Sequence, residues 1–260
     1  MAVPAIQEVL PLISGTEHET ARRIAMMAGD TLLSLREEWT RPDDVKGLRD
    51  HGDRTSHSLI LRLLRDAYPE DAILSEEGKD DPIRRSRRRV WIVDPLDGTR
   101  EFAEGRTDWA VHVALVVDGE PMAGAVALPD RGITLSTVCP PEILVATPGR
   151  LRVVVSRTRA PAIAYSVAQM LGADVVEMGS AGAKTAAVIL GEADIYLHAG
   201  GQYEWDSAAP VAVALASGLH VSRLDGSPLC YNQIDPWLPD QLVCRPELAQ
   251  RVLAAMAARV

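Results

Sequence analysis

Two aspartates lie three residues apart in the stretch WIVDPLDGTREF, directly after an apolar run that is typical of a buried strand. Proline fixes its own φ and cannot donate to a strand ladder, so we expect the chain to turn between Asp94 and Asp97. The turn would bring both carboxylates and the Leu96 carbonyl to one side. Two carboxylates held close repel unless one is protonated or a cation lies between them. The spacing therefore predicts an oxygen site for a hard divalent ion such as Mg²⁺.

A plain acidic turn is the alternative interpretation, because aspartates in turns often accept hydrogen bonds from nearby backbone N–H groups. Taken alone, the D-x-x-D-G pattern favours that alternative. Two further acidic motifs, ILSEE with Glu76 and EWDSAAP with Asp206, make a plain acidic turn the less favoured interpretation. Phosphate monoesters hydrolyse very slowly in water, and a pair of metal ions can both activate water and stabilise the leaving oxygen. The acidic motifs together favour phosphate chemistry.

The elements that position these motifs follow from hydrophobic periodicity. Apolar spacing predicts an amphipathic helix from about His18 to Glu38, and a second helix from Arg54 to about Ala67 with Asp53 just before it. The segment Ala72–Ser75 has the pattern of a short strand, and Trp109–Thr137 has that of an antiparallel meander. This part of the chain is therefore expected to be α+β.

Strands and helices alternate in the second part of the chain, up to a helix SAAPVAVALASG that follows Asp206. This alternation indicates a sheet covered by helices. Proline stretches at 139–141 and 147–149 provide the boundary. We expect an N-terminal α+β half, residues 1–146, that carries most metal ligands, and a C-terminal α/β half, residues 150–260, that carries Asp206 and substrate contacts.

Composition limits the classes of partner. The 260 residues carry a formal net charge of −9, which argues against binding a nucleic-acid polymer. Three cysteines without ligand spacing indicate neither a disulfide framework nor a zinc site. No apolar run approaches the roughly 20 residues that cross a bilayer, and no signal-like segment is present, so we expect a cytoplasmic protein without a membrane partner. The arginine-rich run 84–89 is expected to be a solvated loop, with attraction of a polyanionic substrate as the alternative.

Two polar residues beside the acidic motifs are expected to be structural. Glu77 follows a candidate ligand at a strand end, where successive side chains point in opposite directions. His112 lies within the apolar run VHVAL, and the six histidines show no ligand spacing. We therefore expect Glu77 to support the strand end and His112 to be a hydrogen-bonded residue of the sheet.

The acidic motifs, in this order, resemble those of the inositol monophosphatase superfamily of metal-dependent, often lithium-sensitive phosphomonoesterases. The resemblance extends from Asp53 to the closing stretch SPLCYNQIDPWLPDQLVC. DPLDGTREF, GSAGAK and YLHAGGQYEWDSAAP are most similar to the CysQ branch of actinobacteria, which acts on 3′-phosphoadenosine 5′-phosphate. The resemblance implies an α/β protein, a layered α/β/α/β/α sandwich of the inositol monophosphatase and fructose-1,6-bisphosphatase type.

The resemblance also implies a ligand set for Mg²⁺, with two or three ions. Glu76, Asp94 and the Leu96 carbonyl would hold the ion that activates water. Asp94, Asp97 and Asp206 would hold a second ion, so that Asp94 is shared between the two.

The same resemblance implies which residues are catalytic and which bind substrate. Asp53 and Thr99 would orient or deprotonate the attacking water, and Glu76 completes the catalytic set. The approach GLRDHGD differs from the usual threonine and lysine run, which leaves Asp50 as a rival to Asp53. The candidate substrate contacts are Gly98, Thr99, Arg100, Arg157, Lys184 and Asp206.

We therefore expect a Mg²⁺-dependent phosphatase that removes the 3′-phosphate from 3′-phosphoadenosine 5′-phosphate in sulfur metabolism and that lithium inhibits. The first alternative is the same chemistry on inositol-1-phosphate, fructose-1,6-bisphosphate or a modified nucleotide. The second alternative is an inactive nucleotide-binding regulator, against which the complete set of acidic residues speaks. Relatives are often dimers, so the resemblance suggests a homodimer, while the sequence itself leaves the oligomeric state open.

Overall fold

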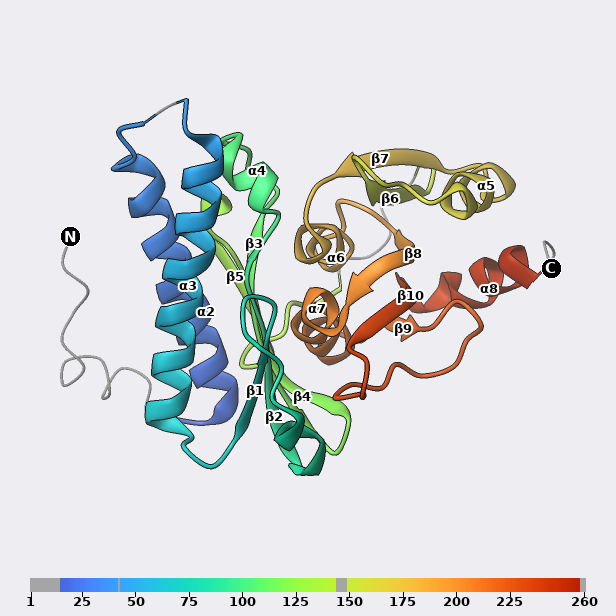
Figure 1. The fold of residues 1–260 in the computed structure, drawn as a ribbon. Coiled ribbons are helices and arrows are strands. Elements are labelled where there is room, and N and C mark those ends of the chain that lie inside the picture. The colour runs from blue at the N-terminus through green and yellow to red at the C-terminus, as the bar shows by residue number, and fades with distance from the viewer. Residues whose placement is uncertain (1–14, 42, 144–148, 258–260) are drawn as a thin grey trace.

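The structure is a computed structural model that describes residues 15–41, 43–143 and 149–257, and its elements form five layers (Figure 1). Helices form the first, third and fifth layers: α2 (Glu17–Glu37) with α3 (Val45–Ala67), α6 (Ala181–Ile189) with α7 (Glu204–Ala216), and α5 (Ala162–Leu171) with α8 (Ala249–Ala257). Two five-stranded sheets lie between them. The layered α/β/α/β/α sandwich expected from the sequence is confirmed. Among the described residues, no helix combines the length and apolar character needed to span a bilayer.

The first sheet has the strand order β1-β2-β3-β4-β5. Its strands are β1 (Ala72–Ser75), β2 (Arg89–Asp97), β3 (Ala110–Val117), β4 (Glu120–Leu128) and β5 (Ile133–Ser136). Strands β1 and β2 are parallel, and the other neighbours are antiparallel. The short strand and the meander predicted from the sequence are both present.

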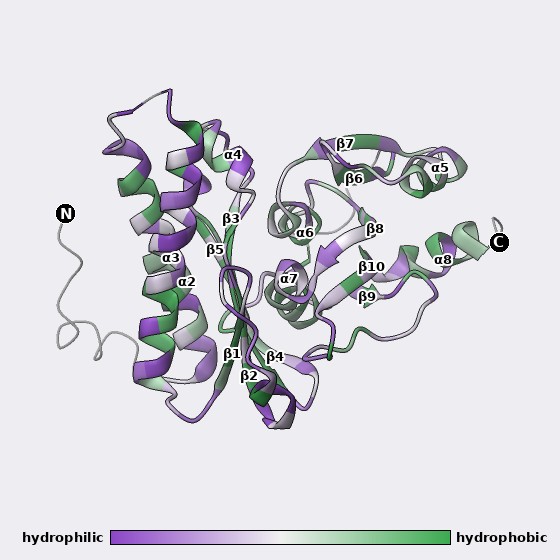
Figure 2. Ribbon diagram, in the orientation of Figure 1, coloured by the Kyte–Doolittle hydropathy of each residue, from purple (hydrophilic) through white to green (hydrophobic). Residues whose placement is uncertain are grey.

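Strand β2 is buried on both faces, which explains its continuous apolar sequence. Val90 and Ile92 belong to the core that this sheet shares with α6 and α7, whereas Trp91 and Val93 belong to the core under α2 and α3. Side chains on a strand alternate between faces, so one strand serves both cores. Figure 2 shows that the strands of the first sheet are largely hydrophobic and that hydrophilic residues lie on the outer helices α2 and α3.

The second sheet has the strand order β7-β6-β8-β10-β9. Its strands are β6 (Arg152–Ser156), β7 (Asp174–Met178), β8 (Ile195–Tyr203), β9 (His220–Ser222) and β10 (Trp237–Cys244). Strand and helix alternate from β6 to α7, as predicted. The change from one sheet to the other occurs between β5 and β6, near the predicted boundary, where residues 144–148 lie outside the described residues. The division into two halves stays a prediction.

Helix α3 begins at Val45, so the prediction of a helix start at Arg54 is wrong. The Asp44 side chain caps this helix by accepting a hydrogen bond from the Gly47 N–H at 2.8 Å. Most residues of its first two turns are polar or glycine, so they lack the apolar spacing of an amphipathic helix. Gly52 packs against Leu96 at a position where an amphipathic helix would have an apolar side chain. Asp53 therefore lies within α3 rather than ahead of it.

The proline of the DPLDG motif does not end β2, contrary to the prediction. Between Asp94 and Asp97, β2 advances three residues while β3 advances two, which is a β-bulge with Pro95 inside it. The chain turns at Gly98, whose φ of +89° is a conformation that favours glycine. A Cβ at Gly98 would also lie 3.2 Å from that of Ser180.

The arginine run is not uniformly solvated, which corrects the expectation for 84–89. Arg84, in the 3-10 helix η2 (Pro82–Ser86), is fully buried. Its guanidinium group donates to Asp80 Oδ1 at 2.6 Å and to the Asn232 side chain and Gln233 carbonyl at 2.8 Å. Arg84 therefore ties two distant loops together.

Candidate active site

A pocket of about 440 Å³ opens where the end of β2, the start of α6, the end of β8 and the start of α7 meet. Most predicted site residues line it: Glu76, Asp94, Leu96, Asp97, Gly98, Thr99, Arg100, Lys184 and Asp206. A volume of this size is typical of a small-molecule site. Asp53 and Arg157 are not among the lining residues.

Asp94 is the most deeply buried of the carboxylates in the cluster. Burial, followed by the neighbouring charges of Glu76, Asp97 and Asp206, raises its pKa well above the usual range. Its Oδ1 accepts a hydrogen bond from the Leu96 N–H at 3.1 Å, which fixes the side chain across the bulge. Without a cation, burial and these neighbouring charges therefore disfavour the ionised form of this carboxyl group.

Glu76 and Asp206 approach Asp94 from two different elements. Glu76 follows β1 and retains exposed surface. Partial removal of its carboxyl group from water and the charge of Asp97 raise its pKa to about 7, and interaction with Asp94 opposes the rise. Asp206 lies in the first turn of α7, where its Oδ2 accepts from the Tyr203 N–H at 2.7 Å. Burial and the charge of Asp97 raise the pKa of Asp206 to about 7.

Asp97 differs from its neighbours because one of its carboxylate oxygens has several partners in the protein. Its Oδ2 accepts hydrogen bonds from the Ser180 hydroxyl at 2.5 Å and from the Gly182 N–H at 2.7 Å, and His112 Nε2 lies 3.2 Å away. Burial alone would raise the pKa of Asp97, but the ion pair with His112 and these hydrogen bonds lower it overall. Asp97 is therefore the anchored charge of the cluster.

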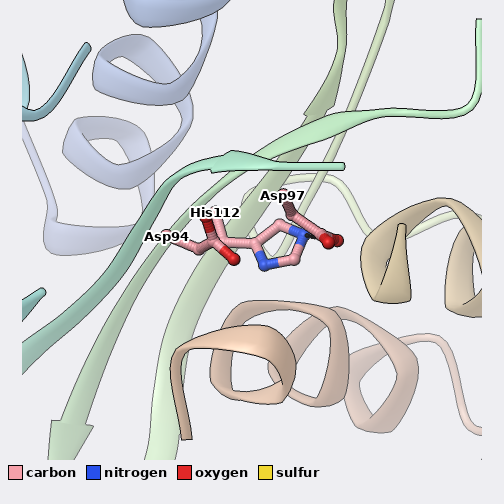
Figure 3. Close-up of side chains that lie close together, drawn as sticks. All are labelled: Asp94, Asp97 and His112. Carbon is pink, nitrogen blue, oxygen red and sulfur yellow. Dashed lines mark ion pairs between the residues drawn. The ribbon is translucent and has the colours of Figure 1, made fainter. Parts of the chain in front are cut away.

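Figure 3 shows the His112 ring beside Asp94 and Asp97. Ligand atoms of these three residues lie within 4.8 Å of one another. His112 Nδ1 lies 3.1 Å from the Trp205 carbonyl, which agrees with the prediction that His112 is a hydrogen-bonded residue of the sheet. Burial lowers the pKa of His112 and Asp97 raises it, with a net rise. Its contact with Asp97 is a role that the sequence interpretation missed.

Asp53 reaches the site from α3. Burial, followed by the charges of Glu77 and Asp50, raises the pKa of Asp53 to about 7, and interaction with Thr99 opposes the rise. The Thr99 hydroxyl donates a hydrogen bond to the Leu96 carbonyl at 3.2 Å. The pairing of Asp53 with Thr99 stays a prediction, which the influence of Thr99 on the pKa of Asp53 supports. Glu77 acts on the site through its charge, although it was expected to be only structural.

Ser180 and Gly182 of the GSAGAK stretch have contacts in the site, although the sequence interpretation assigned a role only to Lys184 of this motif. Ser180, at a φ of +41°, caps α6 and donates to Asp97. A Cβ at Gly182 would lie 2.1 Å from His112 Nε2, so only glycine fits there. The small residues of this motif were the available signal for a close approach between the two halves.

The candidate substrate contacts differ in their exposure and in whether their side chains already have partners within the protein. Arg100 is exposed at the pocket wall. Lys184 Nζ is buried and donates to the Gly179 and Ser180 carbonyls at 3.0 and 2.5 Å, and burial lowers its pKa to about 8. The Arg157 guanidinium group donates to Glu101 and Glu104 at 2.6 and 2.9 Å, outside the pocket lining.

The donor set fits a hard divalent cation. Carboxylates of Glu76, Asp94 and Asp206 crowd together with raised pKa values, which indicates that their charges lack compensation from the protein. Carboxylate oxygens and a backbone carbonyl are the ligands that such ions prefer. A cation between them would allow all these carboxylates to ionise.

Comparisons with known proteins agree with this geometry. The chain matches the inositol monophosphatase family over residues 19–140 and 141–259. It is 50% identical over 254 residues, covering 93% of each chain, to a 3′-phosphoadenosine 5′-phosphate phosphatase of Mycobacterium leprae (strain TN). It is 32% identical, over 83% of this chain and 94% of the relative, to the 3′(2′),5′-bisphosphate nucleotidase CysQ of Escherichia coli (strain K12).

The fold is also similar to solved structures. The crystal structure of CysQ from Bacteroides thetaiotaomicron matches with a TM-score of 0.72 and 27% sequence identity, covering 85% of this chain and 94% of that one. The crystal structure of inositol monophosphatase II from Staphylococcus aureus MSSA476 matches with a TM-score of 0.73 and 24% identity, covering 88% and 91%. The second likeness concerns the fold alone.

Proposed function

The chain belongs to the inositol monophosphatase family, and from this premise we propose that it is a Mg²⁺-dependent phosphatase that converts 3′-phosphoadenosine 5′-phosphate to AMP and phosphate. The observation that carries the proposal is the carboxylate cluster at one end of a pocket that also contains exposed arginines. The 50% identity to a 3′-phosphoadenosine 5′-phosphate phosphatase, over 93% of both chains, supports the choice of substrate.

The cation site in this proposal consists of Glu76, Asp94, the Leu96 carbonyl, Asp97 and Asp206. Bound Mg²⁺ would supply Lewis acidity that activates water and neutralises charge on the phosphate group. The chain's own contribution is to hold the oxygens in place before any ligand arrives. Asp97 is fixed by Ser180 and Gly182, and Asp94 is fixed by the Leu96 N–H.

The proton of the attacking water is assigned to Asp53 and Thr99. A carboxyl group with a pKa of about 7 is suited to accept a proton near neutral pH. The Thr99 hydroxyl donates to the Leu96 carbonyl, and Thr99 lowers the pKa of Asp53, so in this proposal the hydroxyl lies between the cluster and α3. The N–H groups of Gly98 and Thr99, which follow the bulge, would donate to the phosphoryl oxygens.

The proposal predicts phosphate release from 3′-phosphoadenosine 5′-phosphate that requires Mg²⁺ and stops on chelation. Inositol-1-phosphate and fructose-1,6-bisphosphate are the comparison substrates, and we expect kcat/KM values at least about 10-fold lower for both. A preference for inositol-1-phosphate would reassign the substrate. No release from any of the three with Mg²⁺ would instead favour the inactive regulator. A cytoplasmic location and a homodimer stay predictions.

A further inference from the structure

The end of β6 and the turn after it supply one wall of the pocket with Ser156, Thr158 and Arg159. The Ser156 hydroxyl accepts a hydrogen bond from the Arg159 N–H at 3.2 Å, which holds this turn in place. The Arg159 side chain is exposed and lines the pocket. Within the described part of the chain, no carboxylate forms an ion pair with it. Its positive charge is therefore available to an anionic ligand.

Arg157, two residues earlier, has a different environment. Its guanidinium group lies 2.6 Å from Glu101 and 2.9 Å from Glu104, so two carboxylates already neutralise it. Its backbone N–H donates to the Met178 carbonyl at 3.0 Å. Arg157 thus compensates the buried Glu101, which lines the pocket, and is not free to bind substrate.

Arg159 enters the pocket at the end of β8. A Cβ at Gly201 would be 3.7 Å from Arg159 Nη1, which places the guanidinium group over the end of β8. The charge of Arg159 helps to lower the pKa of His198, another pocket residue on β8, after the larger effect of burial. By contrast, Arg100 directly follows Thr99 at the acidic end of the pocket.

We propose that Arg159 binds the second, non-reacting phosphate of a bisphosphate nucleotide and so sets the preference for bisphosphates over monophosphates. A guanidinium group matches phosphate with two parallel hydrogen bonds, and it remains charged at every relevant pH. The carboxylate cluster would treat every phosphomonoester alike, so specificity must come from contacts to the part of the substrate that does not react. The assignment rests on the proposed function, and it gives Arg159 a substrate contact that the sequence had suggested for Arg100, Arg157 or Lys184.

The test compares 3′-phosphoadenosine 5′-phosphate with 3′-AMP, which lacks the second phosphate. In Arg159→Ala, the ratio of kcat/KM for the bisphosphate to that for 3′-AMP should fall by about 10- to 100-fold, mainly through KM. Arg159→Lys should recover part of the ratio, because a lysine keeps the charge but loses the fork. Thermal denaturation checks that each variant is folded.

Three other arginine variants separate this assignment from its rivals. Arg157→Ala and Arg100→Ala should change the ratio by less than about threefold, even where they lower both rates. Arg87→Ala, which removes an exposed arginine outside the pocket lining, is the matched charge control. An unchanged ratio in Arg159→Ala, or a larger fall in Arg157→Ala or Arg100→Ala, would overturn the assignment. A wild type that does not hydrolyse the bisphosphate would refute the proposed function instead.

Discussion

Asp94 and Asp97 lie on the same strand and have opposite pKa shifts. Both are buried, so burial alone cannot separate them. The difference comes from partners: Asp97 receives hydrogen bonds from the GSAGAK loop and faces His112, whereas Asp94 faces mainly other carboxylates. A cation would therefore change the protonation of Asp94 far more than that of Asp97.

Asp94→Asn should lower kcat by at least about 10³-fold while preserving the fold, because the shared ligand is lost. The asparagine oxygen can still accept from the Leu96 N–H, so the bulge keeps its hydrogen bond. Melting of the metal-free variant should occur at the same or a higher temperature, since a buried carboxyl group is removed. Asp118→Asn, at an exposed position, is the control. Wild-type turnover in Asp94→Asn at saturating Mg²⁺ would exclude Asp94 as a shared ligand.

Asp53→Asn tests the assignment of the proton acceptor against Asp50. We expect kcat to fall by about 10²- to 10⁴-fold with KM changed less than about threefold, because the amide cannot accept a proton from water. Asp50→Asn should retain activity within about threefold, since Asp53 is the residue whose pKa Thr99 lowers. Steady-state kinetics of both variants decide the matter, and the reverse pattern would transfer the role to Asp50.

At the scale of elements, hydrophobic periodicity was sufficient for most helices and strands. It failed where burial involves small or polar residues. The first turns of α3 bury Leu48 and Gly52 with few apolar side chains, so the pattern began too late. The bulge in β2 was read as a turn because Pro95 cannot donate to a ladder, yet the Ser56 hydroxyl of α3 donates to its carbonyl at 2.7 Å. That contact between distant segments has no local signal.

The burial of Arg84 also depends on distant segments and could not be predicted from its sequence neighbours, which suggest a solvated loop. Arg84→Ala should lower the free energy of unfolding by about 3 kcal/mol, since Asn232 and the Gln233 carbonyl lose a buried partner. This corresponds to a fall in melting temperature of about 6–12 °C. Arg85→Ala, at an exposed neighbouring arginine, should shift it by less than about 2 °C. Equal melting temperatures for the two variants would contradict the inferred role of Arg84.

At the scale of the molecule, the alternation of strands and helices predicted a sheet covered by helices, and the family resemblance implied the five layers. The acidic motifs predicted residues that come together at one pocket. The sequence could not predict which groups from the second half would contact the first. Ser180 and Gly182 anchor Asp97, and Arg159 replaces Arg157 at the pocket wall, because packing between the two halves fixes their positions. Spacing along the chain carries no information on such contacts.

The whole cluster makes the stability of the metal-free protein depend on pH. Asp53, Glu76 and Asp206 have pKa values of about 7 in the folded protein, whereas unfolded carboxyl groups titrate near about 4. The folded state therefore binds more protons than the unfolded state between these values. Its stability falls as the pH rises through this window, and the loss is complete above about pH 7. Asp97, with its lowered pKa, contributes in the opposite sense but only at lower pH.

Magnesium should reverse this loss, because a cation that binds the ionised cluster stabilises the folded state alone. We expect about 10 mM Mg²⁺ to raise the melting temperature by several degrees at about pH 8 and by less than about 1 °C at about pH 5, where the cluster is protonated. Sodium chloride at equal ionic strength controls for screening. Asp94→Asn should lose most of the rise at pH 8, since it lacks the shared ligand. A Mg²⁺ effect of equal size at both pH values, or one that sodium reproduces, would show that the cation does not act through these carboxylates.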